Sequence, residues 1–309
     1  MPYLSRPKCS RCQCSVQLFY DVVDPKAAVY PSVRSTLAPL LSKDENSNRT
    51  SSAKGNDSDR PTTVVLSHGF GSGSELWKDQ VPALVQAGFR VVSWDMCGHA
   101  KSSSPESECC YSKQHQIDDL SRVMEATGCH ASGQKPILCG HSMGGYDTML
   151  YYFAHPEKVA AMVLYGTGPG FASDKSRLKW NATAEKMAAA YDRKGLGALR
   201  GSDTRKGHRS AVGLALSCRR VFAQHEDDPL YKSFGKDGPL TTARNLNTVA
   251  VPVSIIIGER DKGFLRASKI MHERMPNATL SILTGVGHLA CEKDPQQFNK
   301  VRTHQLVSF

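Results

Sequence analysis

The chain has 309 residues, of which 40% are hydrophobic and 22% charged, as is ordinary for a globular protein with one large domain. Its formal net charge of +10 could attract nucleic acid, but no stretch alternates basic with aromatic residues, so we expect no nucleic-acid partner. Ten cysteines are too sparse for a disulfide scaffold, and neither a signal-peptide core nor an apolar run of membrane-spanning length occurs, so we expect a reduced, cytoplasmic protein without stable membrane insertion.

The N-terminal region combines a cysteine cluster with an alternating pattern. Cys9, Cys12 and Cys14 form C-x-x-C-x-C, a spacing that could indicate a metal or redox site. From Cys12 to Tyr20, however, apolar and polar residues nearly alternate, which favours a half-buried strand. No second Cys/His cluster of matching spacing follows, so we predict a strand here and no metal site.

Residues 27–60 are polar and irregular, and residues 42–59 consist almost wholly of small polar and charged types. Such a composition cannot bury enough apolar surface to offset the entropy of ordering. It predicts a disordered surface insertion that could be removed without loss of the core.

Beyond this insertion, predicted strands and helices alternate. The predicted strands are 62–67, 90–94, 137–141, 159–165, 253–258 and 279–283. The predicted helices are 75–87, 112–127, 146–153, 264–275 and one that starts at Pro295. This order is typical of a mostly parallel sheet with helices on both faces.

One connection is much longer than a single crossover helix requires. Residues 172–248 contain two helical stretches and predict a helical cap over the strand ends, between core parts at 1–171 and 249–309. The cap holds 15 Lys/Arg and 8 Asp/Glu, which should mostly form a solvated face. A minority of these charges could steer an acidic substrate toward a cleft.

A nine-residue segment, 137–145, indicates the reactive centre. An apolar run leads into Gly140-His141-Ser142-Met143-Gly144, and a helical segment follows. In a G-x-S-x-G turn the serine sits on a strained backbone, and the glycines prevent collisions where strand and helix cross. This pattern predicts Ser142 as a nucleophile, although the pentapeptide alone also fits a glycine-rich loop with an incidental serine.

An unassisted serine hydroxyl is a poor nucleophile, so Ser142 needs a base and a group that orients the base. Asp261 follows one late strand and His288 follows the next, at the sheet edge where Ser142 should emerge. Glu259 is the nearest competitor for the acid, but it lies two residues closer to the strand.

In order and spacing, these motifs resemble the α/β-hydrolase superfamily, with capped serine esterases and lipases nearest. The resemblance covers residues 14–24 and 61–309 and rests on His68-Gly69-Phe70-Gly71, Asp95 with Gly98 and Ser102, Gly140 to Gly145, Gly258 with Asp261, and Gly287-His288 followed by Glu292, Asp294 and Pro295. It implies an α/β-hydrolase fold, with a mostly parallel central sheet flanked by helices and a helical cap inserted between the sixth and seventh strands.

The resemblance also implies roles for particular residues. Ser142 would be the nucleophile, His288 the general base and then acid, and Asp261 the group that orients and stabilises the imidazolium. The backbone N–H groups of Phe70 and Met143 would form the oxyanion hole.

The chain departs from the family in one loop. Where the family has D-x-R-G-x-G-x-S, Cys97 replaces the Arg and Ala100 the second Gly, which puts the packing of the loop in doubt more than catalysis. Haloalkane dehalogenases and epoxide hydrolases of this fold place Asp at the serine position, so Ser142 disfavours their mechanism.

Taken together, the motifs predict hydrolysis of a carboxylic ester, thioester or lactone through an acyl-serine, with no metal or cofactor. The expected partner is a small-molecule ester, for which an anionic substrate is one option. Two alternatives stay open: a ligand-binding or signalling protein that turns over slowly or not at all, and a carbon–carbon bond hydrolase or perhydrolase with the same triad. Substrate identity and oligomeric state do not follow from the sequence.

Overall fold

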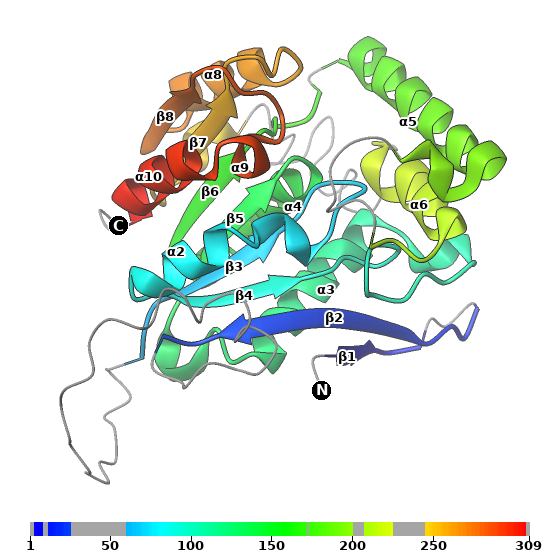
Figure 1. The fold of residues 1–309 in the computed structure, drawn as a ribbon, viewed down its shortest axis with the longest axis horizontal. Coiled ribbons are helices and arrows are strands. Elements are labelled where there is room, and N and C mark those ends of the chain that lie inside the picture. Colours follow the sequence, from blue (N-terminus) through cyan, green and yellow to red (C-terminus); the bar gives the residue numbers. More distant parts are fainter. Residues whose placement is uncertain are drawn as a thin grey trace, which may run out of the picture.

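The structure is a computed structural model that describes residues 3–8, 12–25, 60–171, 173–199, 207–224 and 245–306, the last five by backbone alone. Eight described strands form one sheet in the order β1-β2-β4-β3-β5-β6-β7-β8 (Figure 1). They are β1 (Tyr3–Arg6), β2 (Val16–Val23), β3 (Thr63–Ser67), β4 (Arg90–Trp94), β5 (Ile137–His141), β6 (Ala161–Tyr165), β7 (Val253–Gly258) and β8 (Ala278–Leu283). The insertion predicted at 27–60 lies almost wholly outside the described residues.

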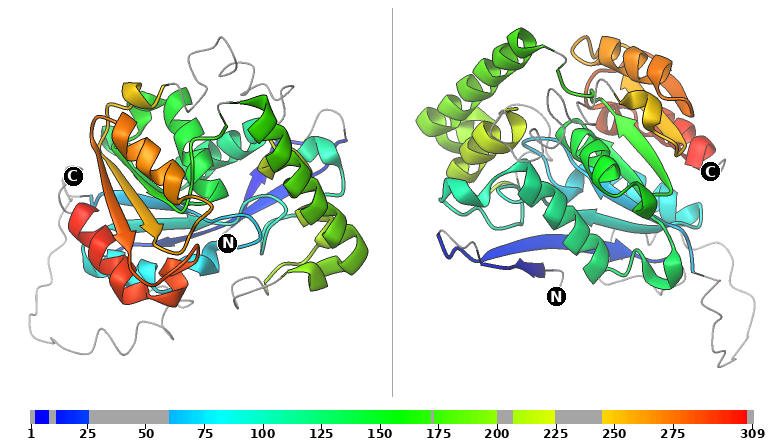
Figure 2. Two further views of the ribbon diagram at one scale, coloured as in Figure 1. Left: turned by 90° about the horizontal axis from the view of Figure 1, so that it is seen from above. Right: turned by 180° about the vertical axis from the view of Figure 1, so that it is seen from behind.

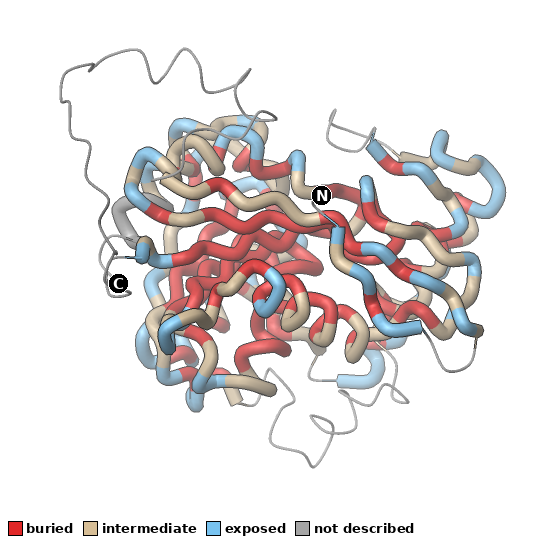
Figure 3. Tube along the Cα trace, turned by 90° about the horizontal axis from the view of Figure 1, so that it is seen from below, coloured by how far each residue is buried: buried red, intermediate tan, exposed pale blue. Residues whose placement is uncertain are grey.

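The sheet is parallel from β4 to β8 and antiparallel where β1 and β2 join its edge. Strands β3, β5, β6 and β7 are buried along their whole length. Figure 3 shows buried segments, in red, running through the middle of the molecule. Continuous apolar runs suit such strands because helices cover both faces of a parallel sheet.

Helices pack on the two faces in separate groups. The described α-helices of the core are α2 (Gln80–Gln86), α3 (Lys113–Ala126), α4 (Met143–Ala154), α8 (Leu265–Arg274), α9 (Ala290–Lys293) and α10 (Pro295–Leu306). Helices α3, α4 and α8 pack against one face of the sheet and share one apolar core with it. Helices α2, α9 and α10 pack against the other face and share a second apolar core (Figures 1 and 2). This mostly parallel sheet with helices on both faces agrees with the predicted fold class.

Two α-helices are described between β6 and β7, where the sequence predicts a cap. They are α5 (Asp174–Lys194) and α6 (Ala211–Ser217), and a π-helical turn at Cys218–Phe222 follows α6. They pack on each other through small residues such as Ala184, Ala188 and Ala215, beyond the carboxyl ends of the parallel strands (Figure 2). We call residues 173–224 the cap segment; its status as a separate domain stays a prediction.

The strand predicted from Cys12 to Tyr20 is wrong at its start. The strand begins at Val16, and Cys12 and Cys14 lie in the connection from β1, a strand that the sequence did not predict. Gln13 takes a φ of 56°, a left-handed conformation that breaks an extended chain. Alternation alone cannot reveal such a kink, and Cys9 lies outside the described residues.

Disulfides and membrane-spanning helices are both unexpected from the composition. None of the nine described cysteines forms a disulfide. No described helix combines the length and apolar character that a membrane span requires.

Candidate active site

Ser142 occupies a strained turn between β5 and α4. Its φ of 52° and ψ of −114° are unfavourable for a residue with a Cβ. The crossing is so close that a Cβ on Gly140 would lie 2.2 Å from the carbonyl oxygen of Gly144, and one on Gly144 would lie 2.5 Å from that of Ser67. Hydrogen bonds from Ser142 N to Tyr165 O (2.9 Å) and from Thr167 Oγ1 to Ser142 O (2.7 Å) hold the turn.

Asp261 and His288 come together after β7 and β8. His288 Nδ1 lies 2.6 Å from Asp261 Oδ2, and the Asp261 side chain is 7% exposed while that of His288 is 33% exposed. The competitor, Glu259, instead accepts a hydrogen bond from Gly285 N (2.8 Å). The structure therefore pairs the histidine with Asp261 and leaves its Nε2 for another partner.

No hydrogen bond joins the described side chains of Ser142 and His288; the ring of His141, the residue before Ser142, lies 4.6 Å from the His288 ring between centroids. Phe264 stacks on the His288 ring, with centroids 5.2 Å apart, and lines the same pocket as Ser142. Hydrogen bonds to a general base are often long before substrate binds, so this arrangement is compatible with proton transfer.

The two predicted oxyanion-hole donors flank Ser142. Met143 is the first residue of α4, where a backbone N–H has no partner within its helix. Phe70 lies in the glycine-bearing turn after β3, and in the described structure neither its N–H nor that of Met143 takes part in a turn or loop hydrogen bond. Both N–H groups can therefore donate hydrogen bonds to an oxygen of a bound ligand.

The other histidines around the site have structural contacts. His141 Nε2 donates to the carbonyl of His288 (3.0 Å), and its ring stacks on that of Tyr165. His68 donates to the Gly69 carbonyl and accepts from Met96 N. Burial lowers the pKa of His99 well below its usual range, with help from His68 and His208, so this ring is a poor proton acceptor.

The loop that departs from the family is held by other residues. Asp95 accepts hydrogen bonds from Ser74 N (2.5 Å) and Lys101 N (3.0 Å), which join two loops beside the site. Cys97 is buried, and the guanidinium that faces it belongs to Arg6 of β1. Ala100 keeps a positive φ of 41°, a conformation that the family's glycine adopts without strain.

A mostly apolar pocket of about 220 Å³ opens at Ser142, smaller than the roughly 300–1,000 Å³ common for ligand pockets. The cap segment contributes Trp180, Val221, Phe222 and Gln224, and the core contributes Tyr146 among others. Trp180 packs on Phe222, with ring centroids 4.5 Å apart, and donates from Nε1 to the Phe222 carbonyl (2.9 Å). None of the described lining residues carries a positive charge.

Comparison with known proteins defines the class. A family model described as the alpha/beta hydrolase fold matches residues 62–295, and the chain belongs to this family. A Bacillus subtilis (strain 168) protein, whose name proposes 2-succinyl-6-hydroxy-2,4-cyclohexadiene-1-carboxylate synthase activity, is 26% identical over 79% of this chain and 90% of its own. The family match and this relative together identify the chain as a member of a hydrolase family.

Two further comparisons show how wide that family is. Epoxide hydrolase B of Mycobacterium tuberculosis is 31% identical over 100 residues, which are 32% of this chain and only 27% of the relative. A crystal structure from a study of carboxylesterases of Nitrososphaera gargenis has a TM-score of 0.70 at 21% identity and covers 99% of this chain and 98% of its own. At that identity the likeness shows the fold alone.

Several residues around the site were not predicted from the sequence. Tyr165 donates from its hydroxyl to the His288 carbonyl (2.6 Å), and Thr167 holds the carbonyl of Ser142. Both residues lie at or just after the end of β6, which was predicted only as a buried strand. The local sequence around Trp180 and Phe222 does not predict that they line the pocket either, because their positions depend on how the cap segment packs.

Proposed function

We propose that the chain hydrolyses a carboxylic ester, or a thioester or lactone, through an acyl intermediate on Ser142. The observation that carries this proposal is the His288–Asp261 hydrogen bond of 2.6 Å beside a strained serine at the mouth of an apolar pocket. A fold of this family without such a pair would leave the serine hydroxyl unactivated.

In the proposed reaction, His288 Nε2 takes the proton of Ser142 Oγ while the oxygen attacks the acyl carbon. The N–H groups of Phe70 and Met143 stabilise the oxyanion, and Asp261 stabilises the imidazolium. The imidazolium then protonates the leaving alcohol or thiol. Water, deprotonated by His288, attacks the acyl-serine, and the proton returns to Ser142 Oγ as the acid leaves.

The pocket lining narrows the proposed substrate. An anionic acyl group was one option because the cap sequence is basic, but the described lining offers no cation to pair with a carboxylate. We therefore propose an uncharged, largely apolar acyl group of small to moderate size. The Bacillus subtilis relative is named for the synthesis of a carboxylate, so its name does not support an uncharged acyl group.

Labelling with a fluorophosphonate probe tests whether the serine is activated, and it separates an enzyme from a binding protein of the same fold. We expect the native chain to be labelled at Ser142, as located by peptide mass spectrometry, because attack on phosphorus needs the same deprotonation. Heat-denatured chain serves as the control and should not react. A native chain that resists the probe would favour the ligand-binding alternative.

Trp180 should set the acyl-chain preference, because it forms a wall of the pocket from the cap segment. Trp180→Ala is expected to raise kcat/KM for p-nitrophenyl octanoate relative to the acetate by at least about 10-fold, since room for even one more methylene in an apolar pocket is worth about 1–3 kcal/mol. Trp180→Phe, which keeps an aromatic ring, should change the ratio much less. An unchanged ratio in both variants would place the acyl group elsewhere.

A further inference from the structure

Two neighbouring cysteines near the N-terminus meet a third, distant in the sequence, outside the active site. Cys12 and Cys14 lie in the connection between β1 and β2, and Cys110 ends the short 3-10 helix Glu108–Cys110 before α3. Their sulfur atoms all lie within 4.8 Å of one another, and the Cys12 and Cys110 sulfurs are 3.4 Å apart across 98 residues. None of the three lines the pocket at Ser142.

The backbone between Cys12 and Cys14 takes an unusual conformation. Gln13, with its φ of 56°, turns the chain between the two cysteines. The backbone of Cys14 and the side chain of Cys109 hydrogen-bond to the Cys12 sulfur. The Cys12 and Cys14 sulfurs lie within 4.8 Å of each other and of Cys110 Sγ, close enough to share one ligand. A non-glycine residue in this conformation costs energy, and such strain often marks a functional site.

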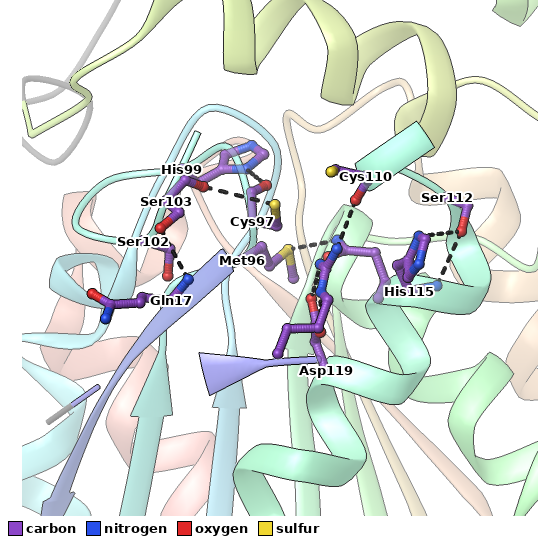
Figure 4. A network of polar contacts seen from close by, with 12 residues as sticks. Gln17, Met96, Cys97, His99, Ser102, Ser103, Cys110, Ser112, His115 and Asp119 are labelled. Carbon is purple, nitrogen blue, oxygen red and sulfur yellow. Dashed lines mark hydrogen bonds and ion pairs between the residues drawn. The ribbon is translucent and has the colours of Figure 1, made fainter. Parts of the chain in front are cut away.

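A buried ion pair holds the two halves of the cluster together. Arg6 of β1 donates from Nη1 to the carbonyl oxygen of Cys110 (2.8 Å) and from Nε to Asp119 Oδ1 (2.8 Å). Arg6 is 7% exposed and Asp119 is fully buried. Figure 4 shows Cys110 directly beside this network, with Asp119 below it on α3. Because one side chain joins β1 to the loop of Cys110, the three thiols are positioned before any ligand arrives.

We propose that Cys12, Cys14 and Cys110 bind one thiophilic divalent ion, with Zn²⁺ as the physiological candidate. Zinc binds thiolates at about 2.3 Å, so two sulfurs of a tetrahedral site lie about 3.8 Å apart, within the range of separations seen here. Binding releases the remaining thiol protons of the ligands to solvent. A fourth position is left for water or for Cys109, whose thiol also hydrogen-bonds with Cys12.

The site departs from the sequence-based expectation of no metal. That expectation rested on the lack of a second cluster with matching spacing, whereas the third ligand here comes from a single residue in a distant loop. The ion would join the β1–β2 connection to the start of α3, so we expect a structural role. This proposal does not depend on the proposed esterase activity.

The test uses the full chain, stripped of metal and kept reduced with a phosphine, and titrated with Co²⁺ as a spectroscopic substitute for Zn²⁺. We expect thiolate-to-cobalt charge-transfer absorption that saturates at one ion per chain and disappears when Zn²⁺ is added. Cys12→Ser, Cys14→Ser and Cys110→Ser should each weaken binding at least about 100-fold, since even outer-sphere changes cost 10- to 100-fold. Cys129→Ser, which alters a buried cysteine outside the cluster, should leave the titration unchanged.

A second readout uses the native chain alone, so it remains informative if the cysteine variants fold poorly. Iodoacetamide should alkylate Cys12 in the metal-free native chain, and one equivalent of Zn²⁺ should protect Cys12 from alkylation, because metal-bound sulfur is not available to the reagent. Absence of the charge-transfer band in the reduced native chain would overturn the proposal. The proposal would also be overturned if the chain bound no cobalt and, after exposure to air, mass spectrometry found a Cys12–Cys110 disulfide.

Discussion

Replacing Ser142 with alanine is expected to lower kcat for a p-nitrophenyl short-chain ester on the order of 10⁶-fold, the loss seen when the nucleophile of a comparable triad is removed. The strained turn should persist, because the glycine contacts around it do not involve the hydroxyl. The measurement is steady-state hydrolysis followed by p-nitrophenol absorbance, with the folded state checked by circular dichroism.

Ser268→Ala is the matched control for this loss. Ser268 is fully buried in α8, and its hydroxyl has no hydrogen-bond partner in the described structure. Its removal should leave kcat within about twofold, as substitutions that break no polar contact usually do. Comparable activity in Ser142→Ala and the native chain would exclude the acyl-serine route.

Asp261→Asn should lower kcat by about 10⁴-fold while the chain stays folded. The carboxylate accepts a hydrogen bond from His288 Nδ1, and this leaves Nε2 unprotonated and ready to take the serine proton. An asparagine can instead offer its N–H₂ group and favour the other tautomer, which cannot act as the base. The loss should appear in kcat with little change in KM, because Asp261 is absent from the pocket lining.

Glu259→Gln separates the role of Asp261 from a general loss of negative charge after β7. Glu259 Oε2 accepts from Gly285 N, and an amide oxygen can keep that bond. We expect a change in kcat of less than about fivefold. A larger loss in Glu259→Gln than in Asp261→Asn would assign the acid to Glu259.

The sequence predicted the central sheet because its strands are apolar runs bounded by turns. Thr63–Ser67 and Val253–Gly258 agree with the predicted ranges to within a residue, and the order of Ser142, Asp261 and His288 followed from where strands end. The strands are local features, so their pattern is sufficient to predict them, and parallel topology predicts which strand ends share an edge.

What the sequence could not predict depends on contacts between distant segments. The meeting of Cys12 with Cys110 is fixed by Arg6, whose partner Asp119 lies 113 residues away. The pocket aromatics Trp180 and Phe222 likewise depend on how α5 and the π-helical turn pack together. Neither arrangement leaves a periodic pattern in the chain.

The most direct test of the proposed function is to trap the acyl intermediate. The native chain is mixed with a p-nitrophenyl ester, quenched in acid within the first turnover and digested for peptide mass spectrometry. We expect the mass of the acyl group on the peptide that contains Ser142, together with a burst of p-nitrophenol equal to the enzyme concentration whenever deacylation is slower. Ester turnover that leaves Ser142 unmodified, even when a slow-deacylating ester is used, would contradict the account.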